Sequence, residues 1–226
     1  MKDPKNDAHA LAILPATSEP YQLVHCGDDF VVVEKPAKLL SVPGRHPENR
    51  DCLVSRVQQQ FPTACIVHRL DYDTSGLVVL PLNKPALSHI SKQFQARSVK
   101  KAYTAVVDGV LDKDEGVIEL GIAKDPDNPR CYKVCEEGKP SKTHYRVLER
   151  DLVTHTTRVL LEPVTGRSHQ LRLHMKALGH CILGDEFYAT AAALAASSRL
   201  MLHAQRISFI QPGSETLLAL EIEVPF

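Results

Sequence analysis

The pattern of apolar and polar positions predicts a chain built mostly from strands. Residues 21–24 and 30–34 are rich in β-forming side chains and are separated by a turn-forming Cys-Gly-Asp-Asp sequence, which predicts a hairpin. The continuous apolar run 76–80 is typical of a strand covered on both faces. Further strands are expected at residues 101–107, 143–148, 157–161, 200–210 and 217–224.

Capping residues and helical spacing predict helices between these strands. Asp51 is placed to cap one helix, and Asn83, with Pro85 just inside, is placed to cap a second. Gly179 is expected to end a third helix in the left-handed conformation. The three predicted helices span residues 51–60, 83–97 and 167–178.

Strands therefore outnumber helices, and most of them follow one another through short turns. Pro126, Pro129 and Gly138 break the middle of the chain into loops around short strands. This pattern predicts an α+β fold with a mainly antiparallel mixed sheet and flanking helices. A length of 226 residues is compatible with one domain, which we expect over residues 21–226 after a flexible N-terminal tail of residues 1–20.

The net charge gives no hint of a partner, but the distribution of charge does. The chain has 27 basic and 27 acidic side chains, so their charges cancel. Residues 87–107 and 163–180 nevertheless contain basic side chains and no carboxylate. Each segment could be an ordinary solvated face, or the two could form positive patches that bind a polyanion.

The cysteine pattern and the apolar runs favour a reduced, cytoplasmic protein. The six cysteines are scattered without a Cys-x-x-Cys pair, and a structural metal site is not expected. Residues 1–20 lack the basic start and long apolar stretch of a signal peptide. No run approaches the roughly 18 apolar residues needed to span a membrane.

The segment 68–76 is the strongest candidate for chemistry. It reads His-Arg-Leu-Asp-Tyr-Asp-Thr-Ser-Gly and leads straight into the predicted buried strand. Polar loops held by a rigid scaffold are common places for active sites. On its own, the segment could equally be a turn in which Asp71 or Asp73 accepts hydrogen bonds from nearby backbone N–H groups.

The motif His68-Arg69-Leu70-Asp71 resembles the signature of RluA-type pseudouridine synthases. Other motifs match in the family's order and spacing, and the resemblance extends from about Leu23 to the last residue. It implies a pseudouridine synthase catalytic domain without an additional N-terminal RNA-binding module. The other matching motifs are Lys35-Pro36, the segment 39–44, Lys101-x-Tyr103, the segments 166–174 and 178–180, Gly184-Asp185 and the segment 200–204.

The resemblance implies an isomerase that converts uridine to pseudouridine at specific sites in structured RNA. The reaction cuts the N-glycosidic bond, turns the uracil and joins its C5 to C1′, which requires no redox cofactor or metal. The target nucleotide should be flipped out of its stack, at a cost of a few kcal/mol. The implied substrates are a tRNA anticodon stem-loop and a 23S rRNA hairpin loop, modified by a monomer in the cytoplasm.

The family match assigns catalytic roles to Asp71, Tyr103 and Arg172. Asp71 matches the essential aspartate, which could act as a nucleophile or as a base near the ribose. Arg172 matches the arginine that pairs with it, although a phosphate contact or a solvated helix face is the alternative. Tyr103 matches a tyrosine that stacks on the base and could assist proton transfer, unless it is an ordinary core residue.

The remaining candidates are substrate-binding residues. Leu202 falls at the apolar position that packs beside the site, and core packing is its alternative role. His68 and Arg69 are placed to contact the vacated stack or the phosphate of the flipped nucleotide. Five further cations would hold backbone phosphates and make affinity fall with salt, namely Arg97, Lys100, Lys101, Arg167 and Lys176.

Two other classes of protein remain open. A non-catalytic RNA-binding protein with the same fold is one, and the joint presence of Asp71, Tyr103 and Arg172 disfavours it. A glycoside or nucleoside hydrolase that uses Asp71 and Asp73 as a carboxylate pair is the other. Residues two apart in an extended loop can share a face, so spacing does not exclude a hydrolase, but the surrounding basic residues disfavour it.

Overall fold

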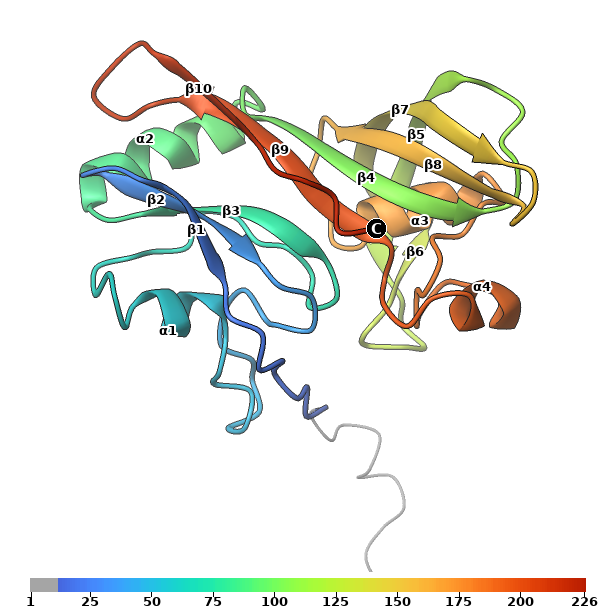
Figure 1. Cartoon of the computed structure of the whole chain (residues 1–226), viewed down its shortest axis with the longest axis horizontal. Helices are drawn as coiled ribbons and strands as arrows, with labels where there is room; N and C mark the ends of the chain where they lie inside the picture. The colour runs from blue at the N-terminus through green and yellow to red at the C-terminus, as the bar shows by residue number, and fades with distance from the viewer. Residues whose placement is uncertain (1–11) are drawn as a thin grey trace, which may run out of the picture.

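A single ten-stranded sheet runs through the computed structural model, which describes residues 12–226 (Figure 1). The strand order is β1-β2-β3-β9-β4-β8-β7-β5-β6, and β10 pairs with β9. Strands β3 and β9 run parallel, whereas the other neighbours run antiparallel, which confirms the predicted α+β class. The strands are β1 (Gln22–Cys26), β2 (Phe30–Lys35), β3 (Ser75–Pro81), β4 (Lys100–Asp108), β5 (Glu115–Lys124), β6 (Tyr132–Val134), β7 (Lys139–Asp151), β8 (Thr156–Pro163), β9 (Leu202–Ile210) and β10 (Leu217–Glu221).

Two helices cover opposite faces of the N-terminal half of the sheet. Successive side chains of a strand point to opposite faces, so β2 supplies two cores. Val31 packs in one core with Val57 of α1, and Val32 packs in the other with Ile90 of α2. All four side chains are fully buried. The described residues contain four helices, α1 (Leu53–Val57), α2 (Lys84–Gln95), α3 (Gln170–Ala177) and α4 (Ala191–Ala195).

The C-terminal half is built around α3, which lies against the sheet formed by β4, β8, β7 and β5 (Figure 1). Leu171 and Met175 of α3 pack in one core with Val159 and Leu161 of β8. Their spacing of four residues along the helix places Leu171 and Met175 on the same face. Each half of the molecule thus has its own core.

The two halves meet where β3 and β9 run side by side. Gly76 has a φ of +120°, and a Cβ atom at this position would overlap the backbone of Ala204. Only glycine allows this close approach of two backbones without strain. Ser75 Oγ also shares a hydrogen bond of 2.8 Å with His203 Nδ1 of β9. The segment that precedes β3, which carries Asp71, is therefore fixed at the seam between the halves.

Two predicted helix starts differ from the structure. Asp51 does not cap a helix, because its carboxylate accepts hydrogen bonds of 2.7 Å from Arg56 and the N-cap is Cys52. The third helix begins at Gln170 rather than at residue 167, since His169 has a left-handed φ of 55°. Gly179 has the predicted positive φ, at +87°. Residues 167–169 consequently belong to a loop and not to α3.

The middle of the chain forms longer strands than its prolines and glycines suggested. β5 contains 10 residues and β7 contains 13, and the two pair along the whole length of β5 except its last residues. Pairing with a distant partner determines this length, and short-range turn signals do not report it. The short helix α4 was not predicted at all; Thr190 caps it by accepting a hydrogen bond from the backbone N–H of Ala193.

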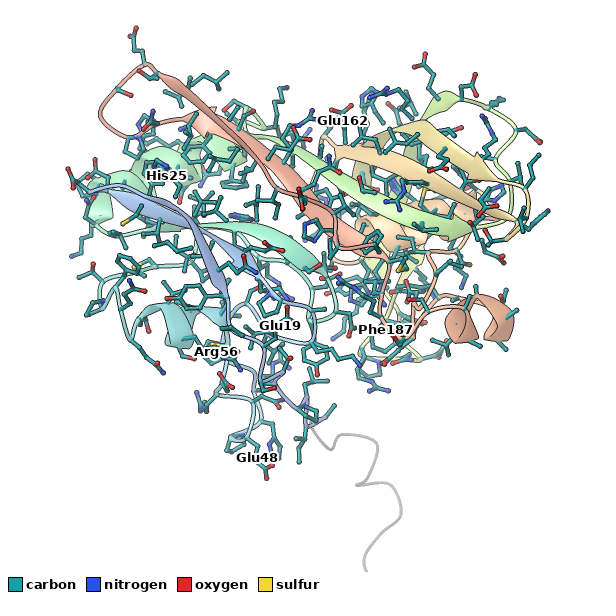
Figure 2. The ribbon with its side chains drawn as sticks, in the orientation of Figure 1. Glu19, His25, Glu48, Arg56, Glu162 and Phe187 are labelled. Atoms are coloured by element: carbon teal, nitrogen blue, oxygen red, sulfur yellow. The ribbon has the colours of Figure 1, made fainter. Side chains whose placement is uncertain are left out.

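The N-terminal segment contacts the domain earlier than residue 21. The carboxamide of Asn49 accepts a hydrogen bond from Leu14 N and donates one to the Ala12 carbonyl, each of 2.8 Å. Arg56 donates to the carbonyl of Glu19, and both residues are labelled in Figure 2. Tyr72, next to Asp71, donates its hydroxyl to the Pro15 carbonyl at 2.5 Å. Of the predicted tail, residues 1–11 lie outside the described residues, while residues 12–20 contact the domain and Pro15 bonds to the residue next to Asp71.

Within residues 12–226, no helix is long and apolar enough to cross a membrane.

Candidate active site

A cavity of about 550 Å³ opens at the seam between the two halves. Three segments that are far apart in the sequence line it, namely 67–74, 94–103 and 163–172, together with Leu202. Nine of the eleven predicted site residues lie on its wall. They are Asp71, Tyr103, Arg172, His68, Arg69, Leu202, Arg97, Lys101 and Arg167.

Lys100 and Lys176 are the two predicted residues that the structure leaves outside this cavity. Lys100 is exposed and precedes Lys101 on β4, and neighbouring side chains of a strand point to opposite faces. Lys176 is exposed on α3, with its ammonium 5.5 Å from the centre of the Tyr188 ring. The periodicity of strand and helix thus separates both lysines from the cavity, and their predicted contact with backbone phosphates stays a prediction.

Asp71 lies on the cavity wall, and its carboxylate has no hydrogen-bond partner within residues 12–226. Its Oδ2 atom lies 3.8 Å from Arg172 Nη1 and 4.0 Å from His169 Nε2. Both distances exceed that of a direct hydrogen bond. Its side chain remains 22% exposed, which leaves the carboxylate available to a ligand in the cavity. A carboxylate held near two N–H donors but bonded by neither can act as a base or a nucleophile.

Asp73 does not line the cavity, although it lies only two residues from Asp71. Burial is the main cause that raises its pKa, and the nearby charge of Glu186 adds to it. A hydrolase with Asp71 and Asp73 as its carboxylate pair needs both groups to face the substrate. The geometry disfavours this alternative.

Arg172 has a closer partner than the one we predicted. Its Nε and Nη2 atoms donate to the two oxygens of Asp185 at 2.7 and 2.5 Å, whereas Asp71 is 3.8 Å away. Only 2% of the Arg172 side chain and 1% of the Asp185 side chain are exposed. Burial alone would lower the pKa of Arg172, but the hydrogen bonds and charge of Asp185 outweigh it, so the pKa is raised. Arg172 therefore remains a fixed cation beside Asp71.

Asp185 belongs to a turn that holds the Arg172 guanidinium in place. Its Oδ1 atom also accepts hydrogen bonds from the backbone N–H groups of Phe187 and Tyr188, at 2.9 and 3.1 Å. The Phe187 ring, labelled in Figure 2, and the Tyr188 ring each lie 5.2 Å from the Arg172 guanidinium carbon. Sequence reasoning placed Asp185 only in a matching Gly-Asp motif, and nothing in the sequence singled out Tyr188.

Tyr103 lines the cavity from β4 and connects the two cores of the protein. Burial raises its pKa well above the usual range, and the charge of Asp71 raises it further. The phenol is therefore protonated at neutral pH. Leu202, at the start of β9, is only 3% exposed and adds an apolar surface to the same wall.

His68 has a structural role that the sequence did not predict. Its Nε2 atom accepts the backbone N–H of Val79 at 2.9 Å, and its ring stacks on Phe94 with 4.7 Å between the ring centres. Burial lowers its pKa to about 3, with a smaller contribution from the charge of Lys101. A neutral ring offers no cation for a phosphate, while contact of His68 with the vacated stack stays a prediction. Arg69, the next residue, is exposed and lines the cavity.

Lys35 fixes the back of the Asp71 loop. Its ammonium is fully buried and donates to the carbonyls of Pro36, Leu39 and Tyr72 at 2.8, 2.8 and 3.2 Å. These bonds tie β2 to the residue that follows Asp71. Burial lowers the pKa of Lys35 to about 7, although the charges of Asp71 and Asp73 oppose that effect.

Lys35→Met is expected to change how stability depends on pH. In the wild type, the unfolded state binds more protons than the folded state between pH 7 and about 10, because an unfolded lysine has a pKa near 10.4. The contribution of Lys35 to the free energy of unfolding should therefore rise with pH across this window. Denaturant titrations at pH 6.5, 8 and 9.5 measure it, and the wild-type-minus-variant difference should grow with pH. A difference that stays constant contradicts the prediction.

Among residues 12–226, no group of three or more His, Cys, Asp or Glu side chains is arranged to hold a metal ion.

The fold and the cavity, which combines the Asp71 carboxylate with several cations, are compatible with an enzyme that acts on a polyanion. The family profile for RNA pseudouridylate synthase matches residues 29–177. The chain belongs to this family, which isomerises uridine to pseudouridine in RNA.

Curated relatives and solved structures agree with this assignment. The dual-specificity RNA pseudouridine synthase RluA of Yersinia pestis is 51% identical over 87% of this chain and 96% of its own. The RluA proteins of Vibrio vulnificus and Escherichia coli K12 are each 47% identical, over 96% and 86% of this chain and 88% and 90% of theirs.

The structure of human RNA Pseudouridylate Synthase Domain Containing 1 has a TM-score of 0.79 and 31% identity, covering 95% of this chain and 87% of that chain. Human RNA Pseudouridylate Synthase Domain Containing 4, at 24% identity and a TM-score of 0.71 over 90% of this chain and 88% of that chain, shares the fold. The predicted likeness to RluA-type enzymes and the predicted catalytic-domain fold are thus confirmed.

Proposed function

We propose that this enzyme has dual specificity and isomerises one uridine in a tRNA anticodon stem-loop and one in a 23S rRNA hairpin loop. The observation that carries the proposal is the position of the Asp71 carboxylate. It lies near Arg172 and His169, at 3.8 and 4.0 Å, on the wall of a cavity that several cations also line. The RluA relatives are named dual-specificity enzymes, which supports the choice of two RNA substrates. Action as a monomer in the cytoplasm remains a prediction.

In the proposed reaction, the flipped uridine enters the cavity with its ribose beside Asp71. The carboxylate acts at or near C1′ while the N1–C1′ bond breaks, and the uracil then turns so that a new bond forms between C5 and C1′. The proton on C5 leaves and N1 acquires one, so the overall change is an isomerisation. The ring of Tyr103 stacks on the uracil, and Leu202 adds apolar contact beside it.

Arg69, Arg97, Lys101 and Arg167 rim the cavity and are the proposed partners of the RNA backbone. A protein cation that neutralises one phosphate releases condensed counterions, which makes binding depend on salt. The enzyme can therefore bind RNA strongly through local charge although its net charge is zero.

Arg167→Ala is expected to weaken RNA binding and to lower the slope of log K against log salt by about 0.7 to 0.9. The Arg167 Nε atom lies 3.3 Å from the Pro140 carbonyl at the surface, so little else should change. Filter binding of an anticodon stem-loop at several salt concentrations measures the slope. Lys100→Ala is the matched control, because Lys100 lies outside the cavity and should leave the slope unchanged. Equal slopes for both variants and the wild type would contradict this assignment of Arg167.

Tritium release from RNA labelled at uracil C5 tests the proposed function. Unmodified transcripts of the anticodon stem-loop and of the rRNA hairpin are compared with transcripts in which the target uridine is replaced by cytidine. Release from both labelled RNAs supports dual specificity, and release from one restricts the enzyme to that substrate. Binding of both RNAs without release from either would favour the non-catalytic alternative.

A further inference from the structure

His169 lies between the Asp71 carboxylate and a buried phenol. Its Nε2 atom is 4.0 Å from Asp71 Oδ2, and its Nδ1 atom is 2.6 Å from the Tyr188 hydroxyl. The imidazole also stacks on Phe187, with 5.7 Å between ring centres and 11° between ring planes. The residue keeps a left-handed φ of 55°, which orients its side chain toward the cavity wall rather than along α3. The family match named His169 only as part of a motif, without a role.

The hydrogen bonds of Tyr188 determine which nitrogen of His169 carries the proton. The Tyr188 oxygen accepts the backbone N–H of Tyr132 at 2.9 Å. Burial raises the pKa of Tyr188 to about 12, so at neutral pH its hydroxyl keeps a proton that must be donated. The nearest acceptor is His169 Nδ1 at 2.6 Å. An Nδ1 atom that accepts leaves the ring proton on Nε2, the nitrogen that faces Asp71.

Burial favours the neutral form of His169, and the charges around it act in both directions. Burial has the largest effect and lowers the pKa of His169. The charges of Asp71 and Asp185 raise this pKa, those of Arg172 and Arg69 lower it, and the net result is a decrease. The phenol of Tyr188 and the ring of Tyr132 are the other titratable groups packed against it. At neutral pH the ring therefore supplies an N–H donor without a second full positive charge beside Asp71.

We propose that His169, held as the Nε2–H tautomer by Tyr188, is a positioning residue that directs the Asp71 carboxylate together with Arg172. Both donors approach the same oxygen, Oδ2, at 4.0 and 3.8 Å, so a small movement of the carboxylate engages them and leaves Oδ1 for the substrate. A neutral donor can orient the carboxylate without a second full positive charge beside it. The inference rests on the proposed catalytic role of Asp71.

The tautomer itself can be read without an activity measurement. Long-range proton–nitrogen NMR of the ¹⁵N-histidine-labelled enzyme distinguishes a protonated from an unprotonated ring nitrogen, and His169→Asn identifies the signals by their loss. At pH 7.5 we expect the Nε2–H tautomer. Tyr188→Phe should remove this preference, since it removes the donor to Nδ1. An Nδ1–H tautomer or a charged ring in the wild type would overturn the proposal.

Two substitutions of His169 separate positioning from simple structural loss. In His169→Asn, the amide reaches the place of Nδ1 and asparagine tolerates the left-handed backbone, but no donor faces Asp71. In His169→Gln, the longer side chain brings an N–H near the place of Nε2. We expect His169→Asn to lower kcat by about 10- to 100-fold, the effect of one hydrogen bond to a charged group, with KM for RNA changed less than about twofold. His169→Gln should recover at least half of that loss on a logarithmic scale.

The kinetic outcomes are distinguishable from failure of the proposed function. If the wild type releases no tritium, the proposed function fails first. If the wild type is active and His169→Asn matches its kcat, the positioning role alone is wrong. A loss of kcat that is equal for the Asn and Gln variants, with both folded as judged by thermal unfolding, also overturns it. A loss confined to KM would assign His169 to RNA binding instead and contradict the proposal.

Discussion

Asp71→Ala should abolish tritium release while RNA still binds with nearly wild-type affinity. Asp71 is the carboxylate at the cavity wall, and it is held by nothing closer than 3.8 Å. Its removal should therefore leave the fold intact and take away the group proposed to act at the ribose. RNA affinity comes mainly from phosphate contacts, which do not depend on one carboxylate. We expect single-turnover rates to fall by at least about 10⁴-fold, which is the effect of removing one of several residues that act together in catalysis.

Asp71→Asn and Asp73→Asn complete this experiment. Asp71→Asn keeps the shape but neither the charge nor the basicity, so it should be as inactive as Asp71→Ala. Asp73→Asn is the matched control, because Asp73 is two residues away and outside the cavity. Loss of RNA binding and of folding together in Asp71→Ala would show that the residue is structural. An equal loss of activity in Asp73→Asn and Asp71→Asn would support the alternative in which the two residues act as a carboxylate pair.

Arg172→Ala should lose both stability and activity. The substitution leaves Asp185 buried at 1% exposure without its bidentate partner, and breaking a buried pair in this way costs about 3–5 kcal/mol. It also removes the cation beside Asp71. Denaturant unfolding and tritium release measure the two effects. Lys176→Ala, on the exposed side of the same helix, is the control and should behave like the wild type.

The double variant Arg172→Met/Asp185→Leu separates the two losses. Replacing both members of a buried ion pair by apolar residues of similar volume is often neutral or stabilising, so part of the stability should return. The loss that remains is expected from the backbone N–H groups of Phe187 and Tyr188, which no longer have the Asp185 acceptor. Activity should not return, because Asp71 still lacks its cation. Recovery of activity along with stability would mean that Arg172 acts only through the fold. Wild-type activity in Arg172→Ala would show that the cation is not needed.

Sequence patterns identified most of the elements because strand and helix periods are local properties. The apolar run 76–80 lies within β3, and Asn83 caps α2 by accepting the N–H of Ala86, as predicted. The sequence pattern does not predict the full length of β5 and β7, since pairing between residues 17 to 31 positions apart, from Ile122–Lys139 to Glu115–Arg146, decides it. Asp51 was a plausible cap by type, but Arg56 competes for its carboxylate.

For the candidate active site, the sequence by itself named the candidate chemical groups, and the tertiary structure decided their partners. The resemblance named Asp71, Tyr103 and Arg172, and all three line one cavity. Only the fold showed that Arg172 binds Asp185 most closely and that His68 is a neutral structural ring. A side chain's type sets which bonds it can form, but its partner is whichever group the packed backbone brings within about 3 Å. That distance depends on contacts between segments that are remote in the chain.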